Sequence, residues 1–111
     1  MMNFYIGNSI DEIDEKDANV EFSDDLINFV YRLSKQESFD MSKLIEINPY
    51  ADVVVSKNDV NKIIEICNYI INKSLLETYN EPEEGNLMLG GLADIAHKAQ
   101  SRNLGLVSIG D

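Results

Sequence analysis

The chain has 111 residues, of which 44% are hydrophobic, so we expect a single domain over residues 1–111 with one core. Twenty acidic residues against nine basic ones leave a formal charge of -11, which would repel nucleic acid and anionic membranes. No apolar run approaches the roughly 18 residues of a membrane-spanning helix, and the first residues do not resemble a signal peptide. These features favour a cytoplasmic protein.

Residues 2–6 are rich in strand-forming side chains and end at Gly7-Asn8, a turn signal, which predicts a short first strand. The next stretch, residues 11–25, carries eight carboxylates against the lone Lys16. It has too few apolar side chains to bury itself, so it predicts an exposed loop leading into a helix.

Ser23 is a good N-cap for that helix, because its hydroxyl can accept a hydrogen bond from an unpaired backbone N–H. Residues 24–35 then have apolar side chains at helical spacing, with Tyr31 at the side of the stripe. Asp40 is a candidate cap for a shorter helix over residues 41–47, which ends before Pro49.

Residues 53–55 are a β-branched run too short to distinguish a strand from a buried extended link. Ser56-Lys57-Asn58-Asp59 resembles a capping box and precedes the strongest helical pattern of the chain. The apolar stripe of that helix consists of Val60, Ile63, Ile64, Cys67, Ile70 and Ile71. Cys67 is the single cysteine, so it lacks an intramolecular disulfide partner and suits a reducing compartment.

Residues 77–85 are polar and contain four glutamates and Pro82, which predicts a loop between helices. Residues 87–100 again fit one helical face, although Gly90-Gly91 should weaken it by about 1 kcal/mol per glycine and allow a close helix crossing. Residues 104–109 predict a terminal strand that pairs with the first. We therefore expect a mostly helical α+β domain, with about four helices and a small sheet formed by the N- and C-terminal strands.

The residues that carry chemistry are too few for the common catalytic and metal sites. Asp94 and His97 are three apart on a predicted helix, but a surface histidine beside a carboxylate is the commoner reason for such a pair. The calcium-loop order that begins at Asp17 fails, because Phe22 replaces the required glycine and Asn28 the bidentate glutamate. We expect no enzyme activity, no cofactor and no metal.

The two ends of the chain resemble bacterial immunity proteins. The residues that carry the resemblance are Asn3-Phe4-Tyr5-Ile6-Gly7-Asn8-Ser9-Ile10-Asp11-Glu12-Ile13, Asn19-Val20-Glu21-Phe22-Ser23-Asp24 and Gly105-Leu106-Val107-Ser108-Ile109-Gly110-Asp111. They are similar to immunity proteins of contact-dependent growth inhibition systems whose toxin domain resembles ribonuclease A. The resemblance implies a cytoplasmic protein that forms a heterodimer with a cognate toxin domain, occludes its active site and protects RNA.

An acidic surface agrees with that implication, because an RNA-cleaving toxin holds phosphates with Lys and Arg side chains. The candidate contacts, which would mimic phosphate, are Asp11, Glu12, Asp14, Glu15, Asp17, Glu21, Asp24 and Asp25. Secondary candidates, as interface anchors or steering charges, are Tyr31, Tyr50, Glu77 and Tyr79. For each acid, a solvated charge or a helix cap is an equally good interpretation. An acidic adaptor or regulatory subunit for another basic protein is the alternative function.

Overall fold

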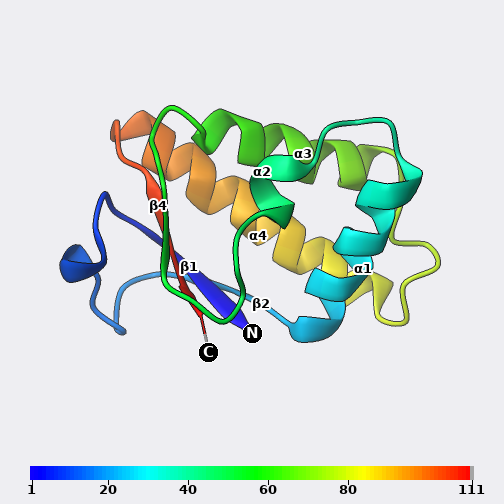
Figure 1. Ribbon diagram of the computed structural model, residues 1–111, viewed down its shortest axis with the longest axis horizontal. Coiled ribbons are helices and arrows are strands. Elements are labelled where there is room, and N and C mark those ends of the chain that lie inside the picture. Colours follow the sequence, from blue (N-terminus) through cyan, green and yellow to red (C-terminus); the bar gives the residue numbers. More distant parts are fainter. Residues whose placement is uncertain (111) are drawn as a thin grey trace.

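The two ends of the chain form the centre of a four-stranded antiparallel sheet (Figure 1). The computed structural model describes residues 1–110. Their elements are β1 (Met2–Ile6), a short 3-10 helix (Ile10–Glu12), β2 (Val20–Phe22), α1 (Asp24–Gln36), α2 (Ser42–Ile45), β3 (Val53–Val55), α3 (Val60–Asn72), α4 (Pro82–Ser101) and β4 (Leu106–Gly110). The predicted α+β architecture with four α-helices is therefore confirmed.

The strand order is β2-β1-β4-β3, so the two three-residue strands lie at the edges. β1 has the predicted bounds and pairs antiparallel with β4, from Met2 opposite Gly110 to Ile6 opposite Leu106. The β-branched run 53–55 is a strand. The prediction of a continuous loop over residues 11–25 is wrong at β2, where Phe22 is 1% exposed on the core side. Three residues are too short an alternation to stand out among so many carboxylates.

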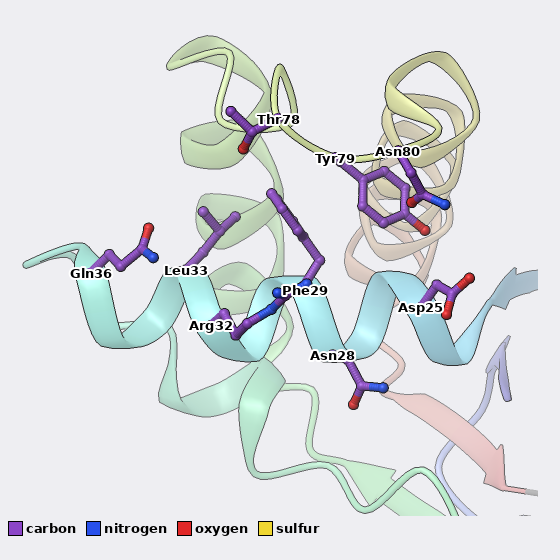
Figure 2. A pocket seen from close by; sticks show the side chains of 9 residues that line it. All are labelled: Asp25, Asn28, Phe29, Arg32, Leu33, Gln36, Thr78, Tyr79 and Asn80. Atoms are coloured by element: carbon purple, nitrogen blue, oxygen red, sulfur yellow. The ribbon is translucent and has the colours of Figure 1, made fainter.

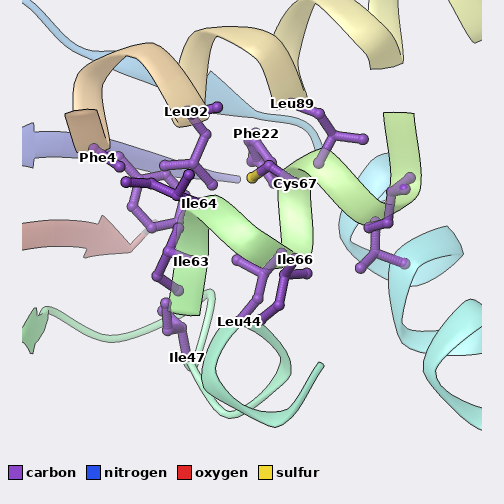
Figure 3. Packing of buried hydrophobic residues seen from close by; sticks show 14 of the residues in the cluster. Phe4, Phe22, Leu44, Ile47, Ile63, Ile64, Ile66, Cys67, Leu89 and Leu92 are labelled. Atoms are coloured by element: carbon purple, nitrogen blue, oxygen red, sulfur yellow. The ribbon is translucent and has the colours of Figure 1, made fainter. Parts of the chain in front are cut away.

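The helices lie on one side of the sheet, where α4 packs against it, and α1 lies farther from the sheet than α2 does (Figure 1). α4 packs against both β1 and β2 and makes its longest contact with α3. Figure 3 shows the resulting core, in which Phe4 and Phe22 of the sheet meet Leu89 and Leu92 of α4. The rings of Phe4 and Phe22 meet edge to face with centroids 5.5 Å apart.

Ser23 caps α1 as predicted, because its Oγ accepts a hydrogen bond from the Leu26 N–H at 3.3 Å. α2 is shorter than predicted. Asp40 accepts a hydrogen bond from the Ser42 N–H at 2.9 Å, and hydrogen bonding to Ser42 lowers the pKa of the Asp40 carboxyl. Asp40 therefore stabilises the chain just before the helix, although Met41 occupies the cap position.

The starts of α3 and α4 differ from the predictions. The Ser56 hydroxyl accepts a hydrogen bond from the Asn58 N–H in a tight turn, so the expected capping box does not form. α4 begins at Pro82 rather than at 87 and takes in part of the predicted loop. Proline suits the first turn, where its missing N–H is not needed, and Glu83 and Glu84 there favour the positive end of the helix.

The glycine pair in α4 has a different role from the predicted helix crossing. A Cβ on Gly91 would lie 3.2 Å from Cγ2 of Val20, so this glycine lets β2 approach the helix. A Cβ on Gly90 would meet no atom within 4 Å. The close approach is therefore between a helix and a strand, and it involves only one of the two glycines.

Cys67 lies in the centre of the core and is fully buried. Burial raises the pKa of its thiol to about 12, so the thiol stays protonated at neutral pH. Because the thiolate is the reactive form, the side chain acts as a small apolar group.

Leu89 and Leu87 of α4 allow a matched test of the core, since the first is 0% and the second 75% exposed. Leu89→Ala should lower the free energy of unfolding by about 2–5 kcal/mol, because it leaves a cavity. Leu87→Ala should change it by about 0.5 kcal/mol or less. Urea unfolding followed by circular dichroism measures both, and equal losses would contradict the assigned burial.

Gly90 and Gly91 form a second matched pair. Gly90→Ala should stabilise the protein by about 0.5–1 kcal/mol, because alanine favours the helix and the added methyl group meets open space. Gly91→Ala should give less stabilisation or a loss, because its methyl group presses on Val20. Thermal unfolding of the two variants measures the difference, and equal gains would show that α4 and β2 are not in close contact.

Candidate functional site

Residues 8–19, which join β1 to β2, form a segment that we call the acidic loop. It lies on the face of the sheet opposite the helices (Figure 1). A Cβ on Gly7 would lie 3.0 Å from Cδ1 of Ile13 and 3.6 Å from Cγ2 of Val107, so both side chains lie close to Gly7 on this outer face. The Ile13 side chain of the acidic loop is therefore placed against the end of β1.

Both ends of the acidic loop are fixed by asparagine side chains. The Asn8 Oδ1 accepts a hydrogen bond from the Gly105 N–H at 2.9 Å, which joins the loop to the start of the last strand. The Asn3 Nδ2 donates to the Asn19 Oδ1 at 2.9 Å, which joins the other end to β1. These bonds give the loop a defined position, so its carboxylates are carried on an ordered segment.

Three of the loop carboxylates shape the loop itself. Glu12 accepts hydrogen bonds from the Asn8 N–H at 3.4 Å and from the Ser9 hydroxyl at 3.3 Å. Asp14 accepts one from the Lys16 N–H at 3.0 Å, and Asp17 accepts one from the Asp14 N–H at 3.1 Å. For Glu12, Asp14 and Asp17, a local structural role is therefore visible.

The remaining predicted carboxylates differ in what they contact. Asp24, at the start of α1, accepts a hydrogen bond from the N-terminal ammonium group of Met1. Among the predicted contact residues between positions 11 and 25, the exposed carboxylates that make no side-chain hydrogen bond or ion pair with residues 1–110 are Asp11, Glu15, Glu21 and Asp25. We call these four the unpaired carboxylates. They are available to a cation of another molecule.

Tyr31 lines an apolar groove between α1 and α2, with a volume of about 340 Å³. Tyr31 forms part of the wall and is 49% exposed, and the Lys35 ammonium lies 5.0 Å from the centroid of its ring. Tyr50 is 73% exposed and follows Pro49, which also lines the groove. Both tyrosines thus expose large side chains, as interface anchors do, and the ring of Tyr31 does so at an apolar depression.

Glu77 and Tyr79 lie in the segment between α3 and α4. Tyr79 and Asp25 both line a polar hollow of about 670 Å³ between α1 and residues 78–80, shown in Figure 2. The Tyr79 ring is only 8% exposed and packs against Phe29, with centroids 5.0 Å apart. Glu77 is exposed. Tyr79 therefore has a packing role in the wall of the hollow, while Glu77 remains accessible.

The twelve predicted contact residues do not form one patch. The acidic loop lies at one end of the molecule, whose longest dimension is 37 Å, and the segment with Glu77 and Tyr79 lies at the other end (Figure 1). α1, with Asp25 and Tyr31, is closer to the second end. A single partner of ordinary size would contact a subset of these residues.

Two residues on the outer face were missed in the sequence. Asp52 precedes β3 and is exposed, and its Oδ1 accepts a hydrogen bond from the Gly110 N–H at 3.3 Å. Ile109 lies opposite Asn3 in the ladder and is half-buried. Alternation along each strand hints at such a face, but only the register shows which residues lie side by side.

The other candidate catalytic and metal-binding residues are not joined into a site in the part of the chain that the structure describes. Asp94 and His97 are both exposed on α4, and no hydrogen bond joins them. Within residues 1–110, no group of three or more His, Cys, Asp or Glu side chains is placed to hold a metal ion. None of the helices described for these residues combines the length and the apolar character needed to cross a membrane.

Comparisons of the chain with protein-family models, with curated protein sequences and with solved structures give no match.

Proposed function

We propose that this protein is an immunity protein, which binds a basic toxin domain in the cytoplasm and neutralises it by covering its active site. The observation that carries the proposal is the set of unpaired carboxylates, Asp11, Glu15, Glu21 and Asp25, exposed on a domain with a formal charge of -11. The resemblance of both chain ends to immunity proteins supports the same function. A ribonuclease is the proposed target, because its active site must bind the phosphates of RNA with cationic side chains.

Charge and packing have different roles in such a complex. Two unit charges 4 Å apart in water interact by only about 1 kcal/mol, so exposed carboxylates contribute mainly to the rate of association. Tight binding requires a few desolvated anchors. Tyr31 at the apolar groove and Val54 at the edge of the sheet both expose apolar side chains, so the structure offers two places for such anchors.

The size of the domain is sufficient for stoichiometric inhibition. A standard interface buries about 800 Å² on each partner, and the surface of this protein is 6313 Å². One face of the domain therefore suffices to cover the mouth of an active site, and no chemistry by the inhibitor is required.

Co-expression with a cognate toxin domain tests the proposal. Growth should be restored and the two proteins should co-purify, while an unrelated protein of similar net charge should do neither. Because the proposed mechanism uses no catalytic residue, His97→Ala should protect as well as the wild type. Failure of the wild type both to protect and to co-purify would contradict the proposal, and binding to a different basic protein instead would favour an adaptor.

Neutralising two unpaired carboxylates of the acidic loop tests their role in steering. Asp11→Asn with Glu15→Gln should slow association with the toxin about two- to tenfold at low salt and reduce the salt dependence of the rate. The control, Glu65→Gln with Asp94→Asn, changes the net charge equally on α3 and α4. Stopped-flow measurements over a range of salt concentrations compare the pairs, and identical rates and slopes would show that the acidic loop does not steer.

A further inference from the structure

The register of the sheet places three residues in one row across its outer face, and Asp52, just before β3, lies at the end of this row. Asn3 of β1 lies opposite Ile109 of β4 on one side and opposite Glu21 of β2 on the other. Because Val53 lies opposite Ser108, Asp52 extends the same register and comes beside Ile109. The hydrogen bond from the Gly110 N–H to Asp52 is consistent with this placement. From edge to edge the row reads Asp52, Ile109, Asn3, Glu21, which we call the outer row.

The acidic loop covers the neighbouring row and leaves the outer row partly open. In the neighbouring row, Val54 lies opposite Val107, which lies opposite Tyr5. Val107 and Tyr5 are 0% and 6% exposed, whereas Val54 at the edge is 43% exposed. In the outer row, Ile109 and Asn3 are half-buried, and Glu21 and Asp52 are exposed. About half of the outer face therefore lacks a complete covering layer.

The chemistry of this open surface defines the kind of molecule that fits it. Its apolar side chains are Val54 on the edge strand β3 and the half-buried Ile109 on β4, and a carboxylate stands at each edge of the sheet, Asp52 and Glu21. Apolar side chains flanked by charged ones are usual in protein interfaces. None of the four strands described for residues 1–110 contains Lys, Arg or His.

The negative charge of this surface also determines which kind of molecule can bind to it. A second copy would bring another formal charge of -11 against the same carboxylates, and RNA or an anionic membrane would be repelled in the same way. A protein surface with an apolar protrusion flanked by Lys or Arg has the complementary pattern. Asp11 and Glu15 of the acidic loop extend the negative potential beyond the outer row.

We propose that the open half of the outer face, formed by the outer row and Val54, is the docking surface for the basic partner. The proposal rests on the proposed function, because it takes the toxin domain as that partner. Val54 and Ile109 contact its apolar protrusion, and Asp52 and Glu21 pair with its cationic side chains. The groove between α1 and α2 and the hollow of Figure 2 then lie outside this contact.

A double charge reversal tests the docking surface. Glu21→Lys with Asp52→Lys should weaken binding of the purified toxin domain at least about tenfold in a calorimetric titration. The matched control, Glu65→Lys with Asp94→Lys, should have a much smaller effect, because these residues lie on α3 and α4. If the wild-type protein binds and the two double variants lose affinity equally, or neither loses affinity, the docking surface is wrong while the proposed function stands. If the wild-type protein does not bind the toxin domain, the proposed function itself is contradicted.

A measurement on the unmodified proteins removes any dependence on the folding of the variants. Amide hydrogen exchange of wild type with and without the toxin domain should slow in peptides covering residues 50–56 and 19–23, which contain the two edge strands. Slowing confined to α1, α2 or residues 78–80 would overturn the docking surface and place the contact at the groove or the hollow.

Discussion

The pairing of β1 with β4 is the constraint on which the rest of the structure depends. It joins the two ends of the chain over five residues each, and it gives the sheet one face that receives α4 and another that receives the acidic loop. Without this pairing the sheet would separate into two ribbons, β2 with β1 and β3 with β4. Two-stranded ribbons of this length are at best marginally stable alone, so the outer face exists only in the complete fold.

Apolar packing and negative charge lie on opposite faces of the sheet. The inner face and the helices bury the large apolar side chains, whereas the outer face carries Glu21 and Asp52 at its edges and the carboxylates of the loop above it. Few cations offset these charges. Lys43 lies 3.5 Å from both Glu46 and Asp59, on the helical side of the molecule. Self-repulsion therefore falls mainly on the outer face, where it opposes the packing of the core.

Long periodic patterns could be predicted from the sequence, and short or non-local features could not. The stripes of α1 and α3 and the two terminal strands were visible because each has enough residues to fix its period. β2 was missed because its pattern has three residues, and the capping box at Ser56 was wrong because a tight turn uses the same side chain. The acidic residues of the candidate site could be named from the sequence. Whether each carboxylate has a hydrogen-bond or ion-pair partner could not, because those contacts form only in the folded protein. Tyr79 shows this dependence, since packing against Phe29 buries it.

Solubility depends on the net charge of a protein and not on where the charges lie. The positions of the cationic side chains therefore say more about the partner than the net charge does. Edge strands are commonly protected from pairing with other chains by lysine. Here β2 and β3 contain no lysine, and the edge charges beside them are Glu21 and Asp52. Negative edges still repel other copies of this acidic protein, so aggregation is opposed, yet they attract a basic surface. Lysine at the same edges would also prevent pairing between edges, but it would repel a basic surface. This difference is the physical reason to associate this face with a cationic partner.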